Sequence, residues 1–138
     1  FAGSNTTNLL NLFMKDTSAG ASHNSIGSSS NQFGEFDVNG FQSVIAIKLD
    51  DLNQIEGVPS PNHIKLDVDG KELEILEGAS NILSEVDSIL VEMEGINLDE
   101  NLEKIENIIS MAGLEEELSW RNKGSRRNRL YLRKYSNE

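Results

Sequence analysis

The fold is decided by residues 62–79, which read Asn62-His-Ile-Lys-Leu-Asp-Val-Asp-Gly-Lys-Glu-Leu-Glu-Ile-Leu-Glu-Gly-Ala79. The pattern predicts a strand over 63–68 that ends in two carboxylates and Gly70, followed directly by a helix over 71–86. A second predicted strand begins at Ser88 and also ends in acidic residues and a glycine. Ligands of open α/β sheets bind beyond the carboxyl ends of strands. These two consecutive strand ends therefore predict the rim of a binding or active site.

The remaining segments complete an alternating order of elements. Turn signals and hydrophobic periodicity predict strands at 8–14 and 44–49, a loop at 16–32, a helical turn at 50–56 with Asp50 as N-cap, a helix at 97–112, and a hairpin of 114–120 with 129–133. From residue 63 the order is strand, helix, strand, helix, hairpin. This order predicts an α/β fold, the second half of a doubly wound sheet with helices on its faces and a terminal antiparallel hairpin.

The predicted helix over 71–86 is amphipathic. Its polar face carries Glu74, Glu77 and Glu85, which we expect to be solvated, and Gly78 is expected to mark close packing on the sheet. One stripe is expected to be buried, and it consists of Leu73, Leu76, Ala79, Leu83 and Val86.

Composition excludes several classes of protein. The 138 residues allow one domain, which we divide into a strand and Ser/Gly-rich loop region at 1–43 and an α/β region at 44–138. Residues 1–120 carry 5 basic and 22 acidic side chains, and this negative charge disfavours binding to nucleic acid. No apolar run approaches the ~18 residues of a membrane-spanning helix. The absence of cysteine fits a reducing compartment, and we expect a cytoplasmic protein.

Four segments carry a resemblance to the FkbM family of S-adenosylmethionine-dependent methyltransferases. They are Leu49-Asp-Asp-Leu52, Ile64-Lys-Leu-Asp-Val-Asp-Gly70, Glu72-Leu-Glu-Ile-Leu-Glu-Gly-Ala79 and Ile89-Leu-Val-Glu92. The resemblance covers residues 44–135 and is weaker before them. Lys48 stands where the family favours Thr, and Asp69 stands where it favours Glu.

The resemblance implies a partial Rossmann-like sheet, the cofactor S-adenosyl-L-methionine, and methyl transfer to the hydroxyl of a small molecule or sugar. The family's glycine-rich first strand-turn and the acidic end of its second strand are missing, and the chain starts at Phe1. We therefore expect the C-terminal half of a methyltransferase domain, inactive alone, with an open sheet edge that favours self-association. The alternative is a non-catalytic α/β interaction module with an acidic rim and a basic C-terminal hairpin.

The resemblance implies roles for individual acidic residues. Asp67 is the predicted catalytic residue, either as general base or as acceptor of a hydrogen bond from the cofactor amine, and Asp69 and Gly70 join it as cofactor-binding residues. A second interpretation of the two aspartates is helix capping, in which a carboxylate satisfies the amides of the first turn. The substrate-side candidates are Glu72, Glu92, Glu94 and His23.

Two further groups of charges have competing interpretations. Lys65 and Glu92 interrupt apolar runs on neighbouring strands, which predicts a cross-strand ion pair unless both side chains reach solvent. Residues 121–138 hold 7 basic side chains and 1 acidic one, a tail that either binds an anion or compensates the acidic body. Aligning Gly70 with the invariant glycine of an EF-hand loop places Lys65 and Leu76 at the anchoring positions, so we predict no metal site.

Overall fold

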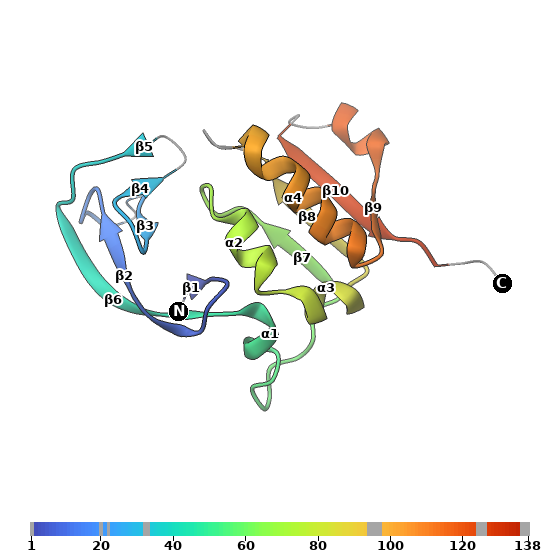
Figure 1. Ribbon diagram of the computed structural model, residues 1–138, viewed down its shortest axis with the longest axis horizontal. Coiled ribbons are helices and arrows are strands. Elements are labelled where there is room, and N and C mark those ends of the chain that lie inside the picture. The colour runs from blue at the N-terminus through green and yellow to red at the C-terminus, as the bar shows by residue number, and fades with distance from the viewer. Residues whose placement is uncertain are drawn as a thin grey trace.

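The computed structural model describes residues 2–19, 21, 23–31, 34–93, 98–123 and 127–135. It shows a mixed α/β protein with two four-stranded sheets and a two-stranded ribbon (Figure 1). The first sheet is built from the N-terminal 47 residues, and the second sheet is built from residue 63 onward. No described helix is long and apolar enough to cross a membrane.

The first sheet has the order β1-β6-β2-β3 and centres on a long antiparallel ladder. Strand β2 (Asn8–Met14), as predicted, pairs with β6 (Gly40–Ile47) from Asn8↔Ala46 to Met14↔Gly40. Strand β6 begins four residues earlier than the predicted strand at 44–49. The proposed division between residues 43 and 44 thus falls inside one strand, and the division itself stays a prediction.

The predicted loop at 16–32 contains short strands. They are β3 (Ser25–Ile26), which joins the first sheet, and β4 (Ser30–Asn31), which pairs with β5 (Gly34–Glu35). The polar composition indicated a loop, but backbone pairing with β2 fixes residues 25–26 against the sheet. Strand β1 (Ala2–Gly3) lies parallel to the end of β6.

The second sheet confirms the predicted order of strand, helix, strand, helix and hairpin. Its strands run β7-β8-β10-β9, with β7 (His63–Leu66) parallel to β8 (Ser88–Glu92). Strand β10 (Asn128–Arg133) lies between β8 and β9 (Leu114–Glu116) and is antiparallel to both. The predicted strand to Trp120 ends early, because residues 118–122 form the 3₁₀ helix η1 (Leu118–Asn122).

Three helices cover one face of this sheet: α2 (Glu72–Glu77), α3 (Ser80–Glu85) and α4 (Leu98–Met111) (Figure 1). The core between them contains the predicted apolar stripe of residues 71–86, and Gly113 follows α4 in a left-handed conformation. The largest side chains with less than 2% exposure are Leu76, Leu83, Ile89, Ile109 and Leu114.

The predicted single helix over 71–86 is wrong, because the chain breaks into α2 and α3 at Gly78 and Ala79. Gly78 packs against the N-terminal segment, where a Cβ atom would lie 2.4 Å from the carbonyl oxygen of Ser4. Close packing at Gly78 was therefore predicted correctly, but its neighbour is the turn after β1. The contact joins the two sheets through the helix layer.

Two charged side chains, Asp50 and Glu74, make contacts that differ from those predicted. Asp50 lies inside α1 (Leu49–Leu52), whose N-cap is Lys48, and its carboxylate instead accepts hydrogen bonds from the amides of Asn81 and Ile82 at 3.0 Å. It therefore caps the start of α3. Glu74 is not on a solvated face, because it accepts a 2.7 Å hydrogen bond from the fully buried Ser4.

The outer side of β7 is an open edge, since no described strand pairs there. A groove of about 350 Å³ runs beside it, and Asn53 in that groove has a buried side-chain oxygen with no partner among the described residues. Exposed backbone groups at a sheet edge favour pairing with another chain.

We therefore expect the 138-residue chain to self-associate or to be marginally stable. Sedimentation velocity over a concentration series, combined with urea unfolding, measures both properties. A dilute sample that sediments as a monomer and also unfolds in one cooperative transition would contradict this expectation.

Candidate functional site

The two acidic strand ends lie side by side, as predicted. Strands β7 and β8 are parallel and pair Leu66 with Val91, so the next residues in register are Asp67 and Glu92. Parallel strands bring their carboxyl ends to the same edge of a sheet. Glu94, the other predicted residue of this rim, lies outside the described residues.

Lys65, Asp67 and Glu92 form one cluster on the sheet face opposite the helices. The Lys65 ammonium lies 2.7 Å from Asp67 Oδ2, and Asp67 also shares a hydrogen bond with Glu92. Lys65 thus forms its ion pair with Asp67, whereas Glu92 acts on Lys65 through a weaker electrostatic attraction. The prediction that Lys65 and Glu92 share a face of adjacent strands is confirmed, and Asp67 contacts both.

The cluster keeps Asp67 ionised. The hydrogen bond from Lys65, followed by the hydrogen bond with Glu92, lowers the pKa of Asp67 below its ordinary value. A general base works best when its pKa lies near the working pH. A carboxylate of low pKa is better suited to accept a hydrogen bond from a cationic group than to remove a proton.

Asp69 and Gly70 turn the chain from β7 into α2, and residues 67–72 are called the corner below. Both have left-handed backbone conformations, with φ values of 54° and 91°. Left-handed geometry is uncommon for a residue other than glycine, and such residues gather at functional sites. The N-cap of α2 is Lys71, whose own side chain makes no capping hydrogen bond, and the capping interpretation of Asp69 stays a prediction.

Glu72 is buried beneath the corner and stabilises it. Its side chain is 6% exposed, and its carboxylate accepts a 3.2 Å hydrogen bond from the backbone N–H of Gly70. Burial raises the pKa of Glu72, although hydrogen bonds from backbone amides act in the opposite direction. The residue therefore holds the Asp69–Gly70 turn in place.

Glu72 should make stability depend on pH in a defined direction. Because its pKa in the folded chain is above the ordinary value of 4.5, the folded state holds the proton more tightly than the unfolded state. The stability that this group contributes is therefore present below pH 4.5, and it is lost as the pH rises through the raised pKa. We expect Glu72→Gln to lower the free energy of unfolding by more near pH 4 than at pH 7. Urea unfolding of both proteins across this range measures the difference, and a constant difference would contradict it.

A cavity of about 320 Å³ lies between the first sheet and the start of α2. Val68, Asp69, Lys71 and Ile75 line it from the corner. The other side is formed by β1, β2 and the Ser-rich connection, through Ala2, Gly3, Leu12, Asn24, Ser25 and Ile26. The cavity therefore brings a segment predicted to be a loop against the predicted cofactor-binding corner.

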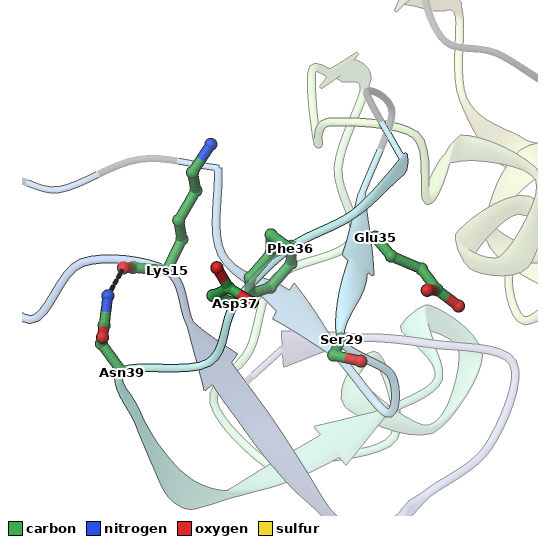
Figure 2. Close-up of a pocket in the computed structure, with 6 residues that line it drawn as sticks. All are labelled: Lys15, Ser29, Glu35, Phe36, Asp37 and Asn39. Carbon is green, nitrogen blue, oxygen red and sulfur yellow. Dashed lines mark hydrogen bonds between the residues drawn. The ribbon is translucent and has the colours of Figure 1, made fainter.

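A second hollow, of about 540 Å³, lies at the far end of the β2–β6 ladder (Figure 2). Asn39 donates a 2.6 Å hydrogen bond to the carbonyl of Lys15 there. Figure 2 shows the Lys15 ammonium and the Glu35 carboxylate pointing in different directions. Because the charged groups do not converge and no predicted site residue lines this hollow, we place the candidate site at the corner.

His23 lies in the connection that leads into β3. It is exposed and has a left-handed backbone, and its carbonyl accepts a 2.7 Å hydrogen bond from Asn31. It is not among the described residues that line the corner cavity, whereas its neighbours Asn24 and Ser25 are. The sequence indicated the right segment, but the burial of Ser25 could not be inferred from its polar surroundings.

The basic tail binds the protein itself at several positions. Arg129 pairs with Glu106 at 2.5 Å, Arg121 binds both oxygens of Glu116, and Lys134 pairs with Glu115. These contacts support the interpretation in which the tail compensates the acidic body. No group of three or more potential metal ligands occurs among the described residues.

Comparisons with known proteins identify the family of this chain. The chain is 34% identical over 80 residues to the hexuronic acid methyltransferase AglP of Haloferax volcanii, and the match covers 58% of this chain and 32% of that relative. No solved structure matches the chain. The sequence profile described as the methyltransferase FkbM domain matches residues 2–126, which includes the first sheet as well as the predicted segments. The chain therefore belongs to the FkbM methyltransferase family.

Proposed function

We propose that this chain is part of an S-adenosylmethionine-dependent O-methyltransferase with a Rossmann-like sheet. The observation that carries the proposal is the pair Asp67 and Glu92 at the ends of adjacent parallel strands, beside the left-handed Asp69–Gly70 turn. Membership of the FkbM family supports an enzyme of the methyltransferase class.

The residues at the corner fit the methionine part of this cofactor. Asp67 offers an ionised carboxylate held by Lys65, which suits an ammonium group as hydrogen-bond donor. When bound, the cofactor supplies the electrophilic methyl group. The protein then contributes mainly by orienting the acceptor oxygen, since positioning accounts for much of the rate of such transfers.

We propose further that these residues form the C-terminal half of the methyltransferase domain. The open edge of β7 supports this proposal, since a further parallel strand would continue the sheet there. The curated relative carries the matched segment as 32% of its length, and its name makes a sugar-type acceptor our proposal for this chain. The interaction-module alternative is weakened by the basic tail, because Arg121, Arg129 and Lys134 pair with acidic side chains of the same chain.

Isothermal titration with S-adenosylmethionine tests the proposal. We expect no appreciable binding to the 138-residue chain alone, because the glycine-rich turn and acidic strand end that hold the adenosine in this family are missing from it. A polypeptide extended by those two segments is expected to bind. Tight binding by residues 1–138 would show that the site lies elsewhere, and no binding by the extended polypeptide would contradict the proposed cofactor.

A further inference from the structure

The cavity beside the Asp69–Gly70 turn combines apolar walls with a few polar groups. Half of its described lining residues are aliphatic, and the polar side chains are Asn24, Ser25, Asp69 and Lys71. Pockets for small ligands are built in this way, with apolar walls and a small number of placed polar groups. Asp69 lines this cavity, whereas Asp67 is not among its described lining residues.

Ser25 and Asn24 give this cavity its hydrogen-bonding capacity. Ser25 is 4% exposed, and among the described residues no side-chain or backbone group makes a hydrogen bond to its hydroxyl. Asn24 uses its side-chain oxygen to accept a 3.1 Å hydrogen bond from the Lys15 amide, which leaves its NH₂ group to donate. A ligand with hydroxyl groups can satisfy both side chains, because a hydroxyl donates and accepts.

The charges around the cavity do not favour an anion. Lys71 is the one cation among the described lining residues, and it already pairs with Glu74 at 3.1 Å. Asp69 adds a further negative charge to the lining, so the three groups together carry a formal charge of −1. The whole chain carries −11, which adds to the repulsion of an anionic ligand.

The volume also limits the ligand. A cavity of about 320 Å³ lies at the lower end of the roughly 300–1,000 Å³ found for small-molecule sites. This space suits one sugar-sized ring better than the adenosine and methionine parts of the cofactor together.

We propose that this cavity is the acceptor subsite and that its acceptor is an uncharged polyhydroxylated ring, such as a neutral hexose. The inference rests on the proposed function and makes it narrower. Ser25 and Asn24 bind hydroxyl groups of the ring, while Ile26 and Val68 contact its apolar faces. The acceptor would then differ in charge from the hexuronic acid named for the curated relative.

Amide chemical-shift titration of the 138-residue chain with methyl β-D-glucopyranoside and with its glucuronide counterpart tests this proposal. We expect saturable shifts for amides of 24–26 and 68–71 with the neutral glycoside, and weaker shifts with the glucuronide. Ser25→Ala should raise the Kd of the neutral glycoside about fivefold, the effect of one hydrogen bond. The matched control is Ser84→Ala, an exposed serine on α3, which should leave the Kd unchanged.

Lys71→Met separates the two acceptor classes, because it removes the charge and keeps an unbranched side chain. It removes the one cation among the described lining residues, so binding of a carboxylate that depends on this charge is lost. Tighter binding of the glucuronide, with loss on Lys71→Met, would overturn the neutral acceptor. Shifts of the amides of 24–26 by S-adenosylhomocysteine would assign the cavity to the cofactor, and no shifts with either glycoside would contradict the subsite. None of these outcomes depends on methyl transfer, which is measured separately.

Discussion

Asp67→Asn is expected to lower kcat/KM for methyl transfer by about 10- to 150-fold, because a charge-assisted hydrogen bond to the ammonium group of the cofactor contributes about 1.5–3 kcal/mol. The substitution keeps the shape of the side chain but removes the charge that pairs with Lys65. Initial rates with a labelled methyl donor measure the effect, in a polypeptide that supplies a strand to β7.

The control for Asp67→Asn is a carboxylate without a structural contact in the corner. Glu74 is unsuitable, because it binds Ser4 and Lys71. Glu103→Gln on the exposed side of α4 is suitable and should change kcat/KM less than about twofold. Equal losses for the two variants would show that Asp67 has no role in the reaction.

Arg133→Met is expected to lower the free energy of unfolding by about 2–4 kcal/mol. The guanidinium donates to the carbonyls of Leu83, Val86 and Ala112 at 2.7–2.9 Å, and these carbonyls lie at the ends of α3 and α4. A hydrogen bond from a charged donor contributes about 1.5–3 kcal/mol, and three such bonds from one guanidinium contribute less than their sum because they share the donor. Their loss leaves partly buried acceptors without this partner.

Urea unfolding at pH 7 measures this effect, and Lys134→Met is the matched control. Lys134 pairs with Glu115 at the surface, where both side chains are more than half exposed, so its loss should cost less than about 1 kcal/mol. An Arg133→Met protein as stable as the Lys134→Met protein would show that the three contacts contribute nothing to stability.

Elements that depend on local periodicity were predictable. The alternation in residues 8–14 gave β2 with its observed bounds, and the apolar spacing before Gly113 gave α4 to within two residues. Parallel pairing of β7 with β8 followed from the helix-length segment between them. In each case the information lies within one element or its immediate connection.

Features that depend on distant contacts were not predictable. The break at Gly78 depends on the carbonyl of Ser4, which lies 74 residues earlier. Asp50 matched the pattern of a local N-cap, yet it caps a helix that begins 30 residues later. Neither partner can be identified from a residue type, because each is brought close only when the two sheets pack around the helices.

The candidate site was predictable in part. Asp67 and Glu92 meet because parallel strand ends share an edge, and this was expected from the sequence. The separation of Asp67 from Asp69 was not expected, since it depends on the left-handed backbone at Asp69. The cavity also needed β3 and β1 to fold over the corner, which the polar composition of residues 16–32 did not indicate.

Transfer of a labelled methyl group from S-adenosylmethionine to a neutral glycoside tests the central claim most directly. The polypeptide must carry a strand that pairs with β7, and mass spectrometry with fragmentation locates the label. We predict label on a hydroxyl oxygen of the glycoside, reduced about 10- to 150-fold by Asp67→Asn. A folded, cofactor-binding polypeptide that leaves every offered hydroxyl unmethylated, or that methylates equally well without Asp67, would contradict the account.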